Sequence, residues 1–144
     1  MTLMNTQTEP TRRVKQIIIV RTDLAMPLGK AFSQVSHASM AFISNKIREG
    51  MKQSGENGAV TVSLNEAERQ WFELKFTKIA LAVSSEEELR SLHRQFEEKG
   101  IATALIVDDG TTVFGGQPTA TCLGVGPAFA DEIDPIAGHL KLYN

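Results

Sequence analysis

Short apolar runs that alternate with segments of helical periodicity constrain the fold of this chain more than any other feature of its sequence. The runs with strand character cover residues 14–21, 78–83, 101–107 and 120–125. Each is brief and apolar, which is typical of a strand buried in a sheet. Helical segments follow the first two runs and favour crossover connections between strands. The order predicts an α/β fold in three layers, with a four-stranded mixed sheet and helices on both faces.

The first helix is expected to start after Asp23 and Pro27, run from Leu28 to about Glu49 and end at Gly50. Its apolar stripe, at spacings of three and four, consists of Leu28, Ala31, Val35, Ala38 and Phe42. Residues 50–62 hold three glycines and are predicted to form a surface loop.

Two capping signals predict where the middle helices start. Ser63 and Glu66 have the spacing of a capping box ahead of a short helix. Ser85 and Glu88 repeat that spacing before a helix that should end at Gly100. A last helix is expected over residues 127–137, interrupted by a proline.

A length of 144 residues fits one domain, which we place at 14–144 behind a flexible N-terminal tail at 1–13. No apolar run reaches the roughly 18 residues of a membrane helix, and the first 30 residues contain no signal-peptide core. The single cysteine favours a reducing compartment. These features predict a soluble, cytoplasmic protein.

The net charge of −2 conceals an uneven distribution. Residues 1–52 carry a local balance of +5, and the remaining residues carry −7. Such a basic half permits a local site for a polyanion without the strong overall field of a DNA-coating protein. Ordinary scatter of charges is an equally good explanation at this point.

Several common site signatures are absent from the sequence. There is no phosphate-binding P-loop, no serine-hydrolase elbow and no complete dinucleotide fingerprint. The three histidines, His37, His93 and His139, lie too far apart in sequence to form a metal-ligand pair. Cys122 lies within an apolar run and is expected to be an inert core thiol. We therefore expect neither a metal nor a cofactor.

One group of polar residues belongs to the first helix. Lys30 lies near its N-terminus, where a cation opposes the helix dipole unless an anion is bound nearby. Gly29 and Lys30 could therefore hold a phosphate or carboxylate. Lys30, Gln34 and His37 fall on one side of the helix, opposite the apolar stripe. Taken alone, this side is better explained by a solvated polar face.

A second group follows the third strand. Asp108 stands at the strand end before Asp109 and Gly110, where a carboxylate is held well enough to act as a base or to orient water. The alternative is an ordinary Asp-Gly turn. Four threonines follow, and their hydroxyls could position a carbonyl or a water molecule: Thr111, Thr112, Thr119 and Thr121. The alternative is that they are simply strand formers, since threonine is common in strands. Both groups together suit hydrolysis of an ester in a phosphate-bearing substrate.

The motif RTDLAMPLGKAFSQVSHA, at residues 21–38, resembles the opening motif of the type-2 peptidyl-tRNA hydrolases. LGVGP at 123–127 and GHLKLY at 138–143 resemble that family's closing segment. The likeness covers residues 14 to 144. It implies a four-stranded mixed sheet between helical layers, a homodimer, and cleavage of the ester that joins a peptide to tRNA. Binding to tRNA would account for the basic half of the chain.

The resemblance also assigns residues. The catalytic positions of the family fall on Lys30, Asp108, Thr112 and Thr121. Gln34 and His37 match motif positions too, and we add them, with Gly29 and Thr119, as substrate-binding candidates. Lys30 would bind the terminal phosphate or stabilise the oxyanion, and Asp108 would orient or deprotonate water.

The chain departs from the family in the turn after the third strand, where it reads DDGTTV. Thr111 replaces an arginine of the family pattern, and Val113 replaces a glutamine. An arginine supplies bidentate contacts to phosphate that threonine lacks. Two alternatives therefore stand beside the hydrolase: a non-catalytic module that binds RNA or protein, and a hydrolase for a small ester or amide.

Overall fold

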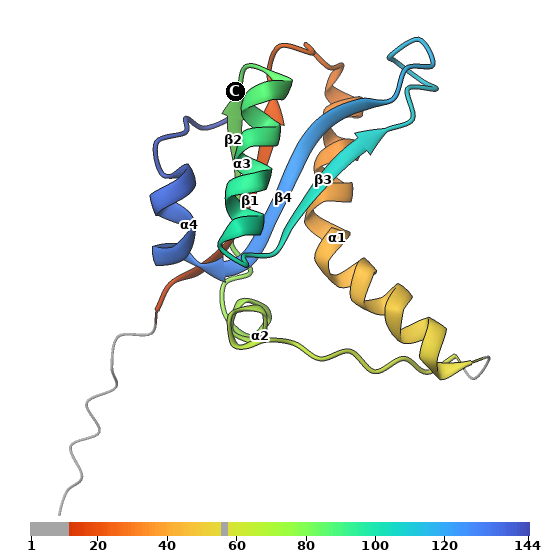
Figure 1. Cartoon of the computed structure of the whole chain (residues 1–144), viewed down its shortest axis with the longest axis vertical. Coiled ribbons are helices and arrows are strands. Elements are labelled where there is room, and N and C mark those ends of the chain that lie inside the picture. Colours follow the sequence, from red (N-terminus) through yellow and green to blue (C-terminus); the bar gives the residue numbers. More distant parts are fainter. Residues whose placement is uncertain (1–11, 56–57) are drawn as a thin grey trace, which may run out of the picture.

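A computed structural model describes residues 12–55 and 58–144 of the chain and has three layers (Figure 1). The strands are β1 (Val14–Arg21), β2 (Lys78–Val83), β3 (Thr103–Asp108) and β4 (Thr119–Phe129). The helices are α1 (Leu28–Ser54), α2 (Glu66–Glu73), α3 (Glu86–Glu98) and α4 (Ala130–Ala137). The predicted α/β class, strand count and element order are confirmed.

The four strands form one mixed sheet in the order β2-β1-β4-β3. β1 runs parallel to β2, whereas β4 is antiparallel to both of its neighbours, β1 and β3. The two long strands β1 and β4 therefore form the centre, and β3 forms one outer edge. This arrangement brings the C-terminal end of β3 to the N-terminal end of α1, which contacts both β3 and β4.

Two apolar clusters bind the layers together, one on each face of the sheet. Along β1, Ile17 and Ile19 face α3 and α4, while Ile18 and Val20 face α1. This is the two-residue alternation of a strand buried on both faces. The predicted core thiol, Cys122, is fully buried on the α1 side, so that prediction is confirmed.

The first helix is longer than expected because Gly50 does not end it. The helix continues to Ser54, and a β-carbon on Gly50 would come within 2.5 Å of the Val60 side chain. Gly50 therefore makes room for the segment that returns along the helix, and residues 50–54 of the predicted loop are helical. Asp23 does not cap the helix either; it pairs with Arg21 at 2.6 Å, and Pro27 occupies the cap position.

The predicted apolar stripe is only partly correct. Leu28 is 69% exposed, and the buried line of α1 is instead Ala31, Gln34, Ala38 and Ala41. The helix thus packs its small residues, together with one amide, against the sheet. Gln34 was placed on the polar side from the helical wheel, and its burial corrects that placement.

Two other helix starts differ by a few residues. The capping box of α2 is formed by Asn65 and Glu68, not by Ser63 and Glu66, because the Asn65 side chain accepts the Glu68 N–H at 2.8 Å. The last helix starts at Ala130, since residues 127–129 complete β4. The Ser85 cap of α3 is as predicted.

Two further sequence predictions concern the N-terminal tail and the absence of a membrane helix. The predicted tail at 1–13 lies, up to residue 11, outside the described residues; Arg12 contacts Asp131 and the Phe129 ring. Among the residues that the structure describes, no helix has the length and apolar character needed to cross a membrane.

Candidate active site

An ion pair between Lys30 and Asp108 lies at the junction of α1 and β3. The Lys30 Nζ atom is 2.8 Å from Asp108 Oδ1, and the two side chains are only 11% and 12% exposed. Lys30 is in the first turn of α1, which contains no acidic residue and lacks a side-chain cap. The Asp108 carboxylate therefore compensates both the lysine and the positive end of the helix dipole.

The buried side-chain amide of Gln34 fixes the position of the Asp108 carboxylate. The Gln34 Nε2 atom donates to Asp108 Oδ1 at 3.0 Å, and Gln34 Oε1 accepts a hydrogen bond from Thr121 Oγ1 at 2.6 Å. Gln34 and Thr121 are 1% and 0% exposed. Because both ends of the amide are bonded, its orientation is fixed, and so is the position of Asp108. Thr121 thus acts on the site through Gln34.

The loop after β3 folds back over the lysine. The Gly110 N–H donates to Asp108 Oδ2 at 2.9 Å, and Lys30 donates to Thr112 Oγ1 at 2.7 Å. Gly110 has φ +83°, and a β-carbon there would lie 2.2 Å from the Gln117 carbonyl oxygen. The tight turn thus requires glycine at this position. The loop holds the hydroxyl of Thr112 beside the ion pair.

These contacts lower the pKa of the Asp108 carboxyl below its ordinary value. The largest cause is the hydrogen bond from Lys30, followed by the Gly110 N–H, the charge of Lys30 and the Gln34 amide, against the opposing effect of burial. The carboxylate therefore stays ionised at neutral pH. It can accept a hydrogen bond from a water molecule, while the neighbouring ammonium can stabilise negative charge that develops on a reacting carbonyl.

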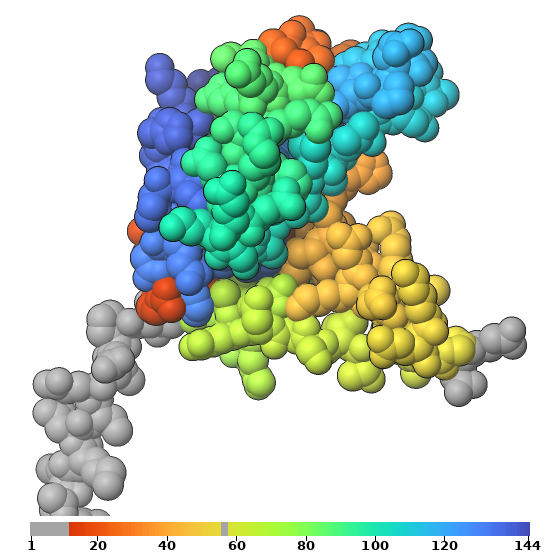
Figure 2. Space-filling model, viewed as in Figure 1, coloured from red at the N-terminus to blue at the C-terminus, as the bar shows by residue number. Residues whose placement is uncertain are grey.

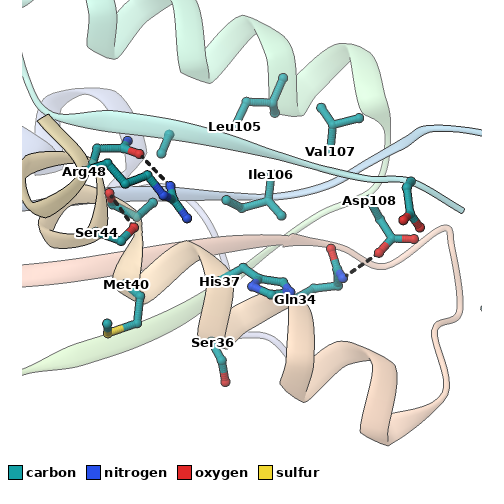
Figure 3. A pocket seen from close by; sticks show the side chains of 14 residues that line it. Gln34, Ser36, His37, Met40, Ser44, Arg48, Leu105, Ile106, Val107 and Asp108 are labelled. Atoms are coloured by element: carbon teal, nitrogen blue, oxygen red, sulfur yellow. Dashed lines mark hydrogen bonds between the residues drawn. The ribbon is translucent and has the colours of Figure 1, made fainter. Parts of the chain in front are cut away.

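A groove of about 720 Å³ leads away from Asp108 between α1 and β3 (Figure 3). His37 lies next to Gln34 on its helical wall, followed along α1 by Met40, Ser44 and Arg48. The opposite wall is β3 itself from Ala104 onward. A substrate that reacts at Asp108 therefore has an extended channel available on one side.

The sequence-predicted residues divide into two groups. The structure brings together Lys30, Gln34, Asp108, Thr112 and Thr121, with His37 at the start of the groove. Two predicted residues lie outside this network. Gly29 is exposed at the start of α1, and Thr119 donates to the Gln117 carbonyl at 2.8 Å.

Two features of the site were missed by sequence reasoning. The Phe114 ring lies 5.7 Å from Lys30 Nζ, and Arg48 lines the far part of the groove. The position of Arg48, about three helical turns beyond His37, could have indicated that it shares that side of the helix. Nothing in the loop sequence indicated where Phe114 would point. Within residues 12–55 and 58–144, no three His, Cys, Asp or Glu side chains cluster closely enough to hold a metal ion.

Comparison with known proteins gives a consistent result. The family model described as peptidyl-tRNA hydrolase PTH2 matches residues 14–143. A peptidyl-tRNA hydrolase of Methanopyrus kandleri is 36% identical over 130 residues, which cover 89% of this chain and 97% of that protein. One of Thermococcus onnurineus is 35% identical over 136 residues, covering 90% and 98%.

Two further matches differ in extent and in kind. A probable peptidyl-tRNA hydrolase 2 of Dictyostelium discoideum is 34% identical over 90% of this chain, and the chain spans about half (54%) of that relative's length. A solved structure of a protein of unknown function from Agrobacterium tumefaciens has a TM-score of 0.54 at 17% identity. It covers 91% of this chain and 98% of its own, and it supports the fold alone.

Proposed function

The chain belongs to the peptidyl-tRNA hydrolase PTH2 family, and from this premise we propose that it hydrolyses the ester bond joining a peptide to tRNA. The proposal rests on the Lys30–Asp108 ion pair, which lies where the groove begins and has the Thr112 hydroxyl hydrogen-bonded to Lys30. It supplies a cation, an ionised carboxylate and a hydroxyl within a few ångströms of one another. This set matches the demands of ester hydrolysis on an anionic substrate.

In the reaction, Asp108 accepts a hydrogen bond from the attacking water and holds it towards the ester carbonyl. The water oxygen forms a bond with the carbonyl carbon, and negative charge develops on the carbonyl oxygen. Lys30 and Thr112 donate hydrogen bonds to that oxygen or to the terminal phosphate. The bond to the ribose oxygen then breaks, and the proton lost by the water passes through Asp108 to that leaving oxygen.

The other candidate residues have supporting roles in this proposal. Gln34 and Thr121 hold the Asp108 carboxylate in place and are positioning residues, since both are buried. His37 contacts the substrate where the groove begins. Gly29 offers its backbone N–H at the helix start to a phosphate. Thr119 supports the end of the loop through its bond to Gln117.

Binding of the tRNA rests on its phosphates. Residues 1–52 carry a basic balance, and four of their cations, Lys30, Lys46, Arg48 and Lys52, lie on α1. We expect tRNA affinity to fall steeply with salt, because each neutralised phosphate releases counterions.

We further propose that the protein acts in the cytoplasm as a homodimer, with a folded domain over residues 14–144 behind a tail at 1–13. The exposed apolar side chains of Leu28 and Phe32 on α1 support a second copy as a partner. Light scattering of the purified chain would test the dimer directly. A monomer at micromolar concentration would contradict it.

The altered loop does not break the site in this proposal. Thr111 donates its N–H to Asp109 Oδ1 at 2.9 Å, while Thr112 still reaches Lys30. An assembled cation, carboxylate and hydroxyl favour catalysis over a purely binding module. The absence of the arginine is expected to weaken phosphate contacts, not to remove the reaction.

The test is single-turnover hydrolysis of an N-acetylated aminoacyl-tRNA by the wild-type chain and by Lys30→Ala and Asp108→Ala variants. We expect cleavage by the wild type and its loss in both variants. Salt-sensitive binding of tRNA without cleavage, at high protein concentration, would replace the hydrolase with a binding module. Cleavage of small esters without any tRNA binding would replace it with a small-substrate hydrolase.

A further inference from the structure

The two outer edges of the sheet differ in how their backbone groups are paired. The edge formed by β2 is covered by the C-terminal segment, where Ala82 N–H donates to the Lys141 carbonyl and Tyr143 N–H donates to the Ala80 carbonyl. Among residues 12–55 and 58–144, no strand or segment pairs with the outer side of β3. An unpaired edge strand is a template for an additional strand.

The register of β3 identifies the groups that face outward. The Gly126 N–H donates to the Ala102 carbonyl at 2.8 Å, so residue 102 faces β4. Since backbone groups alternate along an antiparallel strand, Ala104 also faces β4, whereas Thr103 and Leu105 direct their N–H and C=O groups to the open edge. Of these two residues, Leu105 lines the groove that leads to Asp108.

Helix α1 forms a wall beside this open edge. His37, Met40, Ser44 and Arg48 follow one another along the helix and line the groove opposite β3. The outline of the molecule is hollowed on this side, where α1 is seen beyond β3 (Figure 2). The side chains mix apolar, neutral polar and charged groups, which favours no single peptide sequence. Backbone pairing would therefore supply most of the binding.

We propose that the peptide moiety of the substrate lies in this groove as a fifth strand, parallel to β3. This inference rests on the proposed function, because the ester to be cleaved marks the C-terminal end of the peptide. That end must lie at Asp108, which is also the C-terminal residue of β3. The preceding peptide residues then extend towards Thr103, so the two chains run in the same direction.

The dimensions of the groove set the length of peptide that it holds. The six residues of β3 span about 20 Å at the rise of a strand. The helix wall from Gln34 to Arg48 rises about 21 Å. Both estimates correspond to roughly six extended peptide residues. Residues of the peptide beyond that length leave the groove and make no further contact.

The test is a comparison of kcat/KM for tRNA substrates with the same C-terminal residue and peptides of one to ten residues, all N-acetylated. We expect kcat/KM to rise by about tenfold or more as the peptide lengthens to about six residues, and then to level off. Single N-methylation along the hexapeptide should lower it at alternate positions, because only every second residue bonds to the edge strand. The inference would be overturned if kcat/KM did not change with peptide length. It would also be overturned if the losses in kcat/KM on N-methylation followed the identity of the side chains and not this alternation.

A variant that fills the groove provides the second readout. Ser44→Trp should bring the ratio of hexapeptidyl to single-residue kcat/KM close to one. Glu49→Trp, on α1 outside the groove lining, should keep the wild-type ratio. An unchanged ratio in Ser44→Trp would contradict the proposal. So would a dimer in light scattering that Ser44→Trp dissociates, because the occupant of the edge would then be a second copy.

Failure of the hydrolase proposal is separable from failure of this one. If no substrate of the length series is cleaved, the proposed function fails. A non-hydrolysable analogue, a hexapeptide joined by an amide to 3′-amino-adenosine, then tests whether the groove binds peptide. Its binding is measured by fluorescence anisotropy. Binding that alternate N-methylation weakens supports the added strand, and equal binding of all methylated forms refutes it.

Discussion

The β-carbon that Gly124 lacks would lie 2.2 Å from the carbonyl oxygen of Ala38. This close approach of β4 to α1 holds the helix that bears Lys30 and Gln34 against the strand that bears Thr121. The spacing between α1 and β4, at which the site is assembled, therefore requires that residue 124 has no side chain beyond a hydrogen atom.

The variant Gly124→Ala should lower the free energy of unfolding by about 1–3 kcal/mol or more, because a backbone carbonyl cannot move aside as a flexible side chain can. Urea denaturation measures the loss. Gly29→Ala is the matched control: nothing lies within 4 Å of its added β-carbon, so it should stabilise α1 by up to about 1 kcal/mol. Equal stability of the two variants would contradict the packing described here.

The ion pair gives a prediction about catalysis. Lys30→Met should reduce single-turnover ester hydrolysis by roughly 10²- to 10³-fold, the loss typical of one donor to an oxyanion. Asp108→Asn should reduce it at least as much, since the amide cannot accept the water proton. The double variant should be little worse than the more damaged single variant, because the two groups act as a unit. Fully additive losses would show that Lys30 and Asp108 work independently.

Stability should depend on pH through Asp108. The pKa of its carboxyl is lower in the folded protein than in the unfolded chain, chiefly because of the hydrogen bond from Lys30. The resulting stabilisation is present above the unfolded-state pKa and is lost as pH falls through the lower folded-state pKa. The loss of stability on acidification should therefore be smaller in Asp108→Asn and in Lys30→Met than in the wild type. Urea midpoints at neutral and acidic pH measure it, and identical pH dependence in all three proteins would refute it.

The buried thiol provides a reporter of unfolding. Burial raises the pKa of Cys122 to about 12, and its Sγ atom donates to the Gln34 carbonyl at 3.3 Å. The native protein should therefore resist alkylation by iodoacetamide near pH 8, since the thiolate is the reactive form. Labelling should become complete in denaturant. Rapid labelling of native protein would show that α1 separates from β4 more readily than the packing indicates.

The sequence predicted the elements better than their exact ends. Strong apolar runs and the Ser85 cap located the strands and α3 because those signals are local. Helix α1 continues through Gly50, where Val60 packs so closely that a β-carbon would not fit, and no local rule contains this contact. The shift of the α2 cap to Asn65 reflects a choice between two polar residues with similar capping preference.

For the site, motif resemblance and geometry contributed different parts. Residue chemistry singled out Lys30, Asp108 and Thr121 as candidates, and the resemblance assigned these positions, which lie far apart in sequence, to one catalytic site. The helical wheel misplaced Gln34, because it ranks residues by polarity and cannot detect a buried amide whose partners, Asp108 and Thr121, come from two strands. Hydrogen bonds between polar groups far apart in sequence are therefore the feature of the site that a single sequence does not predict.

The positioning role of Thr121 gives the last prediction. Thr121→Val keeps the shape of the side chain but removes the hydroxyl that donates to Gln34 Oε1 at 2.6 Å. The buried amide oxygen then lacks this donor, which should cost about 1–3 kcal/mol of stability. Because Gln34 no longer fixes Asp108, kcat should fall while KM changes little, as expected for a group that does not touch the substrate. Thr121→Ser, which keeps the hydroxyl, should recover most of kcat. A Thr121→Val variant that raised KM alone, or a serine variant no better than valine, would show that the threonine does not act through Gln34.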